Sequence, residues 1–205
     1  MLEEVYITGN ESDAATKQLQ SSTSLTLKKD ENTGKISATG EAKTDADKKL
    51  LTAINDPNVA VNVNATSSNY TENGNWFAGG AFGGSIVTDG KTNATQTVNP
   101  GGTEAIDKIN EMPKGTSMLH EVLESYIGAK EAPGTQAPTF EDVQNKTSNG
   151  TSYLNAHNKA MVTDPRFKAP NISRGSEGVY ISKFPYNSSI PTTLNPEILL
   201  FKFIK

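Results

Sequence analysis

Hydrophobic and polar residues alternate in short runs over the first hundred positions, as they do in strands with one buried face. The pattern predicts a short strand over 5–8, a hairpin over 24–40 around the turn ENTG, and a strand over 58–65. In the last strand, valines alternate with alanine and asparagine, so that its second face is largely polar. We therefore expect it to be an edge strand.

A helical spacing of hydrophobic residues separates and follows these strands. It predicts helices over 12–20, 44–56, 103–110, 117–128 and 151–162. A polar, proline-containing stretch over 131–150 is typical of a surface loop, and two final strands are expected over 178–184 and 197–205. The apolar run at residues 199–201 is expected to be buried. Together these elements predict an α+β fold with a small mixed sheet.

The composition limits the classes of function. A length of 205 residues fits one domain, and 34% hydrophobic residues predict a modest core with long polar loops. The net charge of -4, with no basic run, argues against nucleic acid as the main partner. The chain has no cysteine, which excludes disulfides, zinc ribbons and thiol nucleophiles. We expect no membrane span and no signal peptide, because no apolar run has the required length or position.

The segment SMLHEVLESY carries the clearest candidate chemistry. On a helix, positions i and i+4 share a face, so His120 and Glu124 would present their side chains to one point. Imidazole nitrogen and carboxylate oxygen are both zinc ligands, and a catalytic site keeps three protein ligands and one open position. Glu121 stands where a zinc-protease helix carries its general base. His157, the second of only two histidines, would complete a set of two histidines and one carboxylate.

Other interpretations remain open at this point. Glu131, Glu141 and Asp164 are alternative carboxylate ligands. The apolar residues around His120 also suit an ordinary amphipathic helix in which Glu124 is solvated. Two ligands of one metal must lie within roughly 3–4 Å of each other, so the distance between the two histidines decides between these interpretations.

The run GTSMLHEVLESYIGAK, followed by YLNAHNKA, resembles the H-E-x-x-E-[AS]-Y … A-H-x-x-A pattern of zincin-like metallopeptidase domains. Such domains occur at the C-terminal tips of Rhs-type and other polymorphic toxins. VYITGNESDAATKQLQ and the hairpin after it are also similar to this group, and the resemblance covers about residues 4–165. It implies one zincin-like domain over 1–205, with C-terminal strands over 178–205 added to that core.

The resemblance also implies roles for individual residues. His120, Glu124 and His157 become metal ligands and Glu121 the base, with zinc as the expected metal and another divalent ion as the alternative. The chain departs from the usual zinc helix because Glu124 stands where a second histidine is expected. In zincin-like folds an edge strand pairs with an extended substrate, so Val61, Asn62 and Val63 are expected to bind it. Trp76 and Phe77 are candidates for a wall of the cleft.

The expected function is therefore a zinc metallopeptidase that acts as a secreted effector or polymorphic toxin. The resemblance implies a larger secreted carrier, a cognate immunity protein, a protein or peptide substrate, and delivery into a target cell. Two alternatives stay open: a non-catalytic structural or cargo protein of a phage or secretion apparatus, and a metal-dependent amidase that acts on cell-wall amide bonds.

Overall fold

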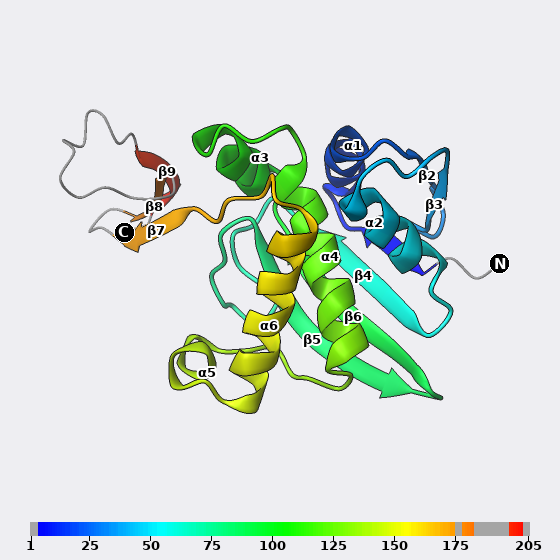
Figure 1. The fold of residues 1–205 in the computed structure, drawn as a ribbon. Helices are drawn as coiled ribbons and strands as arrows, with labels where there is room; N and C mark the ends of the chain where they lie inside the picture. Colours follow the sequence, from blue (N-terminus) through cyan, green and yellow to red (C-terminus); the bar gives the residue numbers. More distant parts are fainter. Residues whose placement is uncertain (1–3, 175–177, 183–196, 203–205) are drawn as a thin grey trace.

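The computed structural model describes residues 4–174, 178–182 and 197–202 (Figure 1). Its elements are β1 (Val5–Thr8), α1 (Ser12–Ser22), β2 (Thr26–Lys29), β3 (Ile36–Thr39), α2 (Asp45–Asn55), β4 (Val59–Ala65), β5 (Gly80–Thr88), β6 (Lys91–Val98), α3 (Pro100–Ile109), α4 (Thr116–Glu131), α5 (Phe140–Asn145), α6 (Ser148–Thr163), β7 (Asn171–Arg174), β8 (Gly178–Ser182) and β9 (Glu197–Lys202). In this described part, six helices and a small mixed sheet confirm the α+β class.

The main sheet has four strands in the order β1-β4-β6-β5. Strands β1, β4 and β6 are parallel, and β5 runs antiparallel to β6. Strand β4 therefore pairs on both sides, and the expectation of an edge strand over 58–65 is wrong. Its asparagines mark an uncovered face of the sheet and not an unpaired edge.

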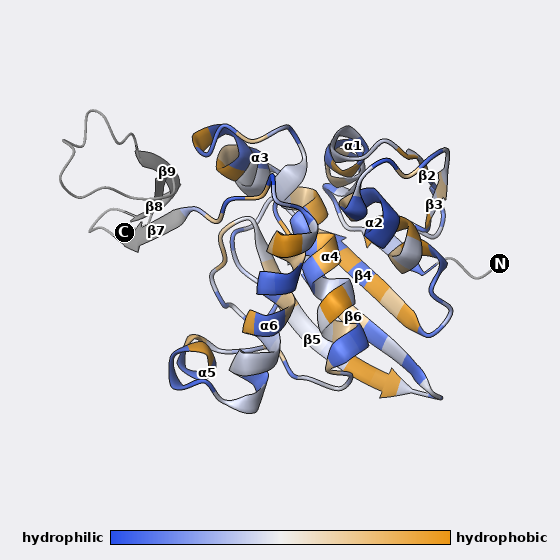
Figure 2. Ribbon diagram, in the orientation of Figure 1, coloured by the Kyte–Doolittle hydropathy of each residue, from blue (hydrophilic) through white to orange (hydrophobic). Residues whose placement is uncertain are grey.

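The two faces of the sheet differ in character. On β4, Val61 and Val63 are buried, whereas Asn62 and Asn64 are only half-buried. Helix α4 lies over the apolar face, where it contacts β4, β5 and β6. Figure 2 shows hydrophobic residues along β4 and on α4 where the helix lies against the sheet. The opposite face is polar.

Helix α4 is the centre of the molecule. It contacts α1, α2, α3 and α6 as well as the sheet, and every residue from Thr116 to Ala129 is buried. The alternative of an amphipathic helix with a solvated Glu124 is therefore wrong, because Glu124 is only 3% exposed. A polar side chain enclosed on all sides needs a partner or a ligand, because burial without one costs free energy.

Several ends of elements differ from expectation. Helix α4 continues past Gly128 to Glu131, and the predicted loop over 131–150 contains the short helix α5. Helix α3 begins at Pro100, three residues earlier than expected, because Asn99 accepts hydrogen bonds from the amides of Gly101 and Gly102.

Strands β7, β8 and β9 form a separate three-stranded antiparallel sheet. The strands expected over 178–184 and 197–205 correspond to β8 and β9, and positions 183–184 and 203–205 lie outside the described residues. The burial expected at 199–201 also lies outside what the structure describes. Among the helices of the described residues, none has the length and apolar character needed to cross a membrane.

Candidate metal centre

His120 and Glu124 lie one turn apart on α4. Helix α6 runs beside this helix (Figure 1). The start of α4 is held from outside, by Asp107 of α3. Its carboxylate accepts hydrogen bonds from the backbone amides of Gly115, at 2.6 Å, and Ser117, at 2.8 Å, and from the Ser117 hydroxyl. The residue at the N-cap of α4 is Gly115, which has a left-handed φ of 83°. A side chain of the preceding helix, eight to ten positions earlier in the chain, thus fixes the turn that precedes His120.

Helix α6 packs along α4 and brings His157 to the same point. His120 Nε2 lies 3.1 Å from His157 Nδ1, and Glu124 Oε2 lies 2.6 Å from His157 Nδ1 and 3.4 Å from His120 Nε2. In the part of the chain that the structure describes, these three residues form a group whose ligand atoms could hold one metal ion. The two histidines, 37 positions apart, therefore converge as the motif requires.

The contacts within this group fit a shared cation better than hydrogen bonds alone. A neutral imidazole has one N–H and one lone-pair nitrogen. If His157 Nδ1 donates to Glu124, it has no lone pair left for His120. His120 Nε2 then either carries a proton and faces the His157 N–H group at 3.1 Å, or carries a lone pair and faces the Glu124 carboxylate at 3.4 Å. A metal at tetrahedral bond lengths of about 2.1 Å would set its ligand atoms roughly 3.4 Å apart. The His120–Glu124 spacing of 3.4 Å already matches this value, whereas the 2.6 Å between Glu124 and His157 would have to widen.

The surroundings of His120 and Glu124 favour the protonation states that metal binding needs. Burial lowers the pKa of His120 more than the neighbouring Glu124 carboxylate raises it, so the ring is kept neutral. Burial also opposes ionisation of Glu124, but the hydrogen bonds with His120 and His157 outweigh it and lower the pKa of Glu124. Neutral imidazole and ionised carboxylate are the forms that bind a divalent metal.

Glu121 lies beside the group but is not one of its members. Its Oε2 accepts a hydrogen bond of 2.6 Å from Gln96 Nε2 on β6, and Gln96 is only 1% exposed. Gly80 on β5 lies against the same carboxylate, because a Cβ atom at that position would stand 2.1 Å from it. Burial, and then the negative charge of Glu124, raise the pKa of Glu121 well above its usual value. A bound divalent cation would oppose this rise by favouring the ionised form.

A cavity of about 390 Å³ opens onto the centre. Glu121, Glu124 and His157 line it together with aromatic residues that include Trp76, Phe77, Tyr153 and Phe167. The ring of Phe167 stacks on that of His120 with centroids 3.6 Å apart. The expectation that Trp76 and Phe77 form a wall of the cleft agrees with this lining. The cavity gives a small molecule or a chain segment access to Glu121.

Other residues named as candidates lie elsewhere. Glu131 pairs with Lys159 and Asp164 with Arg166, and neither joins the group with converging ligand atoms. Val61 and Val63 are buried on the face of β4 that α4 covers, so their assignment to substrate binding is wrong. Asn62 lies on the opposite face, away from the metal centre, and donates a hydrogen bond to the carbonyl of Ala94.

Sequence reasoning missed Gln96 and Phe167. Gln96 carried a usable signal, because it occupies an inward-facing position between Ala94 and Val98 on β6, where a buried amide needs a polar partner. Phe167 gave no such signal, since it follows α6 in a segment without regular spacing. No family model matches the chain, and searches among curated proteins and among solved structures give no match either, so the interpretation of this centre rests on its own geometry.

Proposed function

We propose that this protein is a metal-dependent hydrolase, and specifically a zinc metallopeptidase. The observation that supports the proposal is the convergence of His120 Nε2, Glu124 Oε2 and His157 Nδ1 next to a buried Glu121. Two imidazoles and one carboxylate are a ligand set used by catalytic zinc, which leaves a coordination position for water or substrate. Another divalent ion remains the alternative.

Each residue has a defined task in this proposal. His120, Glu124 and His157 would hold the metal, which when bound polarises a carbonyl group and lowers the pKa of water. Glu121 would accept the proton from the attacking water and pass it to the leaving nitrogen, as a general base and then an acid. Gln96 would hold the Glu121 carboxylate in place through its 2.6 Å hydrogen bond.

Strand β5 replaces β4 as the strand that could guide a peptide substrate. It is the edge of the sheet on the side of Glu121, and Gly80 lies against the Glu121 carboxylate. The later part of the β5 edge is already paired with the segment after α4. The Ser85 amide donates a hydrogen bond of 2.7 Å to the Thr135 carbonyl, and Gly84 forms a β-bridge with Gln136. An extended peptide would therefore pair with residues 80–82, in the way that strands add to a sheet edge.

The biological setting follows from the resemblance of the His-Glu helix and not from the geometry. As an effector or polymorphic toxin, the domain would be delivered into a target cell by a larger secreted carrier, and the producing cell would make an immunity protein against it. An immunity protein that inhibits the domain would have to bind in the cavity beside Glu121 or block access to it.

Metal content and hydrolysis of a fluorescent casein substrate test the proposal together. Wild-type protein should bind about one equivalent of zinc and hydrolyse the substrate in a manner that a chelator abolishes. Glu121→Gln should keep the zinc but lose activity by a factor of about 10² or more, because it removes the base and not a ligand. His120→Ala should lose both the zinc and the activity.

Glu131→Gln is the matched control, because Glu131 lies on the same helix but is exposed and pairs with Lys159. It should keep both zinc and activity. A wild-type protein that binds no divalent metal contradicts the proposal. Zinc binding with full activity in Glu121→Gln contradicts the assignment of the base, and zinc binding without any hydrolysis favours the non-catalytic alternative.

A further inference from the structure

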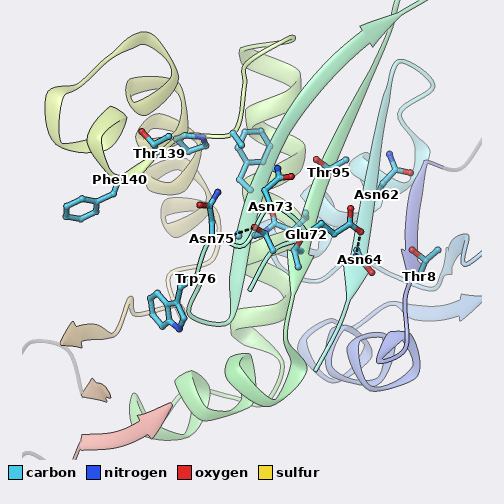
Figure 3. A pocket seen from close by; sticks show the side chains of 18 residues that line it. Thr8, Asn62, Asn64, Glu72, Asn73, Asn75, Trp76, Thr95, Thr139 and Phe140 are labelled. Carbon is cyan, nitrogen blue, oxygen red and sulfur yellow. Dashed lines mark hydrogen bonds between the residues drawn. The ribbon is translucent and has the colours of Figure 1, made fainter. Parts of the chain in front are cut away.

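A second cavity, of about 590 Å³, lies on the polar face of the main sheet, on the side opposite α4 (Figure 3). Its floor is made by Thr8 of β1, Asn62 and Asn64 of β4, and Thr95 and Thr97 of β6. The strand register places Thr8, Asn64 and Thr97 in one row across three strands, and Asn62 beside Thr95 in the next. The floor is therefore a regular array of amide and hydroxyl groups.

The walls add more amides and two aromatic rings. Asn73 and Asn75 come from the loop between β4 and β5, and Figure 3 shows Trp76 and Phe140 at the end of the cavity opposite the polar floor. Phe140 is 76% exposed, which is an unusual position for a large aromatic residue. Exposed aromatic rings beside polar groups are typical of surfaces that bind a ligand.

The charge of the lining narrows the class of ligand. Ten of the eighteen lining residues are Asn, Gln or Thr, and Glu72 is the only one with a charge. A lining without Lys, Arg or His does not suit nucleic acid or another polyanion, which needs a basic face. A lining with a single carboxylate, which Asn64 already contacts at 3.4 Å, does not suit a cationic ligand either.

The kind of polar group narrows it further. The backbone groups of β4 pair with β1 and β6, so the middle of the floor offers side chains and no free strand edge, and the free edge of β5 borders the cavity only at residues 81–82. Asn and Thr side chains both donate and accept hydrogen bonds, as sugar hydroxyls do. In the described part of the chain, the side chains of Asn73, Thr95 and Thr97 make no hydrogen bond with another residue. Aromatic rings supply a flat surface for the apolar face of a sugar ring.

We propose that this cavity binds a neutral oligosaccharide, with its hydroxyl groups on the Asn and Thr floor and a sugar ring against Phe140 and Trp76. The cavity shares six lining residues with the cavity of the metal centre, among them Trp76, Phe82 and Thr139. A glycan seated on the floor would thus lead toward Glu121. The approach of the glycan to Glu121 matters only if the proposed hydrolase function holds, and in that case the substrate is a glycan-linked peptide or amide. Binding of the glycan itself needs no metal.

Isothermal titration calorimetry in the presence of a chelator tests the binding step. The probes are two neutral tetrasaccharides, the β-1,4-linked tetramers of N-acetylglucosamine and of glucose, and a neutral peptide of alternating alanine and threonine. At least one tetrasaccharide should show saturable binding. Thr95→Lys, which puts a charged chain across the floor, and Phe140→Ala, which removes the exposed ring, should each weaken it about tenfold or more.

Asn93→Lys is the matched control, because Asn93 lies on the same face of β6 but does not line the cavity. It should leave the affinity within about twofold of the wild-type value. Failure of both tetrasaccharides to bind overturns the proposal. Tighter binding of the peptide, lost in the same two variants, also overturns it and assigns the cavity to a protein segment.

His120→Ala separates this proposal from the hydrolase function. It should bind the tetrasaccharide as the wild-type protein does, even though it is expected to lose zinc. If the saccharide binds and no metal does, the hydrolase proposal alone is wrong. If metal binds and no saccharide does, the glycan proposal alone is wrong.

Discussion

At the scale of single residues, the centre shows how one helix can give two glutamates different properties. Glu121 and Glu124 are both buried and lie three positions apart. Glu124 lies between two imidazoles, which lower its pKa in spite of its burial, whereas burial and the charge of Glu124 raise the pKa of Glu121. Neighbouring carboxyl groups whose pKa values are pushed apart are typical of sites where one binds and the other moves a proton.

Gln96 is the residue that tests how Glu121 is positioned. Gln96→Leu keeps a buried side chain of similar size but removes the hydrogen bond to Glu121 Oε2. In the proposed enzyme we expect kcat to fall by about 10- to 100-fold, with little change in KM, because the base loses its orientation. Zinc content should not change, because Gln96 contacts no ligand of the proposed metal.

Gln144→Leu, an equivalent change at an exposed position of α5, should leave activity and zinc content unaltered. A loss of zinc in Gln96→Leu would instead show that Gln96 helps to hold the metal ligands in place. An unaltered kcat would show that the hydrogen bond from Gln96 is not needed to position Glu121.

At the scale of the elements, helices are held at their ends by side chains from other elements. Asp107 of α3 holds the start of α4, and Asp56 accepts hydrogen bonds of 2.8 Å from both Tyr126 and Lys130 near its end. Tyr126 is thus held by Asp56 and is not one of the residues that converge at the candidate metal centre. Local sequence shows where α4 is helical, but these non-local contacts fix where it lies.

Asp47 gives a pH-dependent test of this kind of contact. Its carboxylate accepts hydrogen bonds from the Thr23 and Ser24 side chains and from the Thr44 amide, so it joins the start of α2 to the segment before β2. Burial is the largest single influence and opposes ionisation, but these hydrogen bonds outweigh it and hold the pKa of Asp47 well below its usual value. Asp47→Asn should lower the free energy of unfolding by about 2 kcal/mol at neutral pH.

The sign of the pH effect follows from the lowered pKa. The stabilisation by Asp47 is complete above the unfolded-state pKa of about 3.9 and is lost as the pH falls toward the folded-state value. Urea unfolding should therefore show a constant difference between wild type and Asp47→Asn near neutral pH, and a shrinking one below about pH 4. Asp45→Asn, an exposed change in the same turn, should cost less than about 1 kcal/mol. A difference that persists unchanged in acid would contradict the role of the ionised carboxylate.

At the scale of the whole molecule, the sequence predicted which segments form helices and strands better than it predicted which of these elements pair or pack together. The alternation in 58–65 identified a strand, and the i, i+4 spacing identified the face shared by His120 and Glu124. Whether β4 is central or an edge depends on its pairing with β1 and β6, and nothing within the strand encodes those partners. The polar residues Asn62 and Asn64 indicate that one face of β4 is uncovered. From the sequence alone, an uncovered face cannot be distinguished from an unpaired edge. The scarcity of histidine made His157 predictable, because a site with two imidazoles has to use both.

The central claim is that His120, Glu124 and His157 bind one divalent metal ion. Zinc K-edge X-ray absorption of the protein loaded with an equimolar amount of zinc tests it most directly. We predict scattering from two imidazole rings with nitrogen at about 2.0–2.1 Å and from oxygen at a similar distance, and in His157→Ala the scattering of one ring should be lost. A spectrum with oxygen ligands only, or the same imidazole signal in wild type and His157→Ala, would contradict the claim.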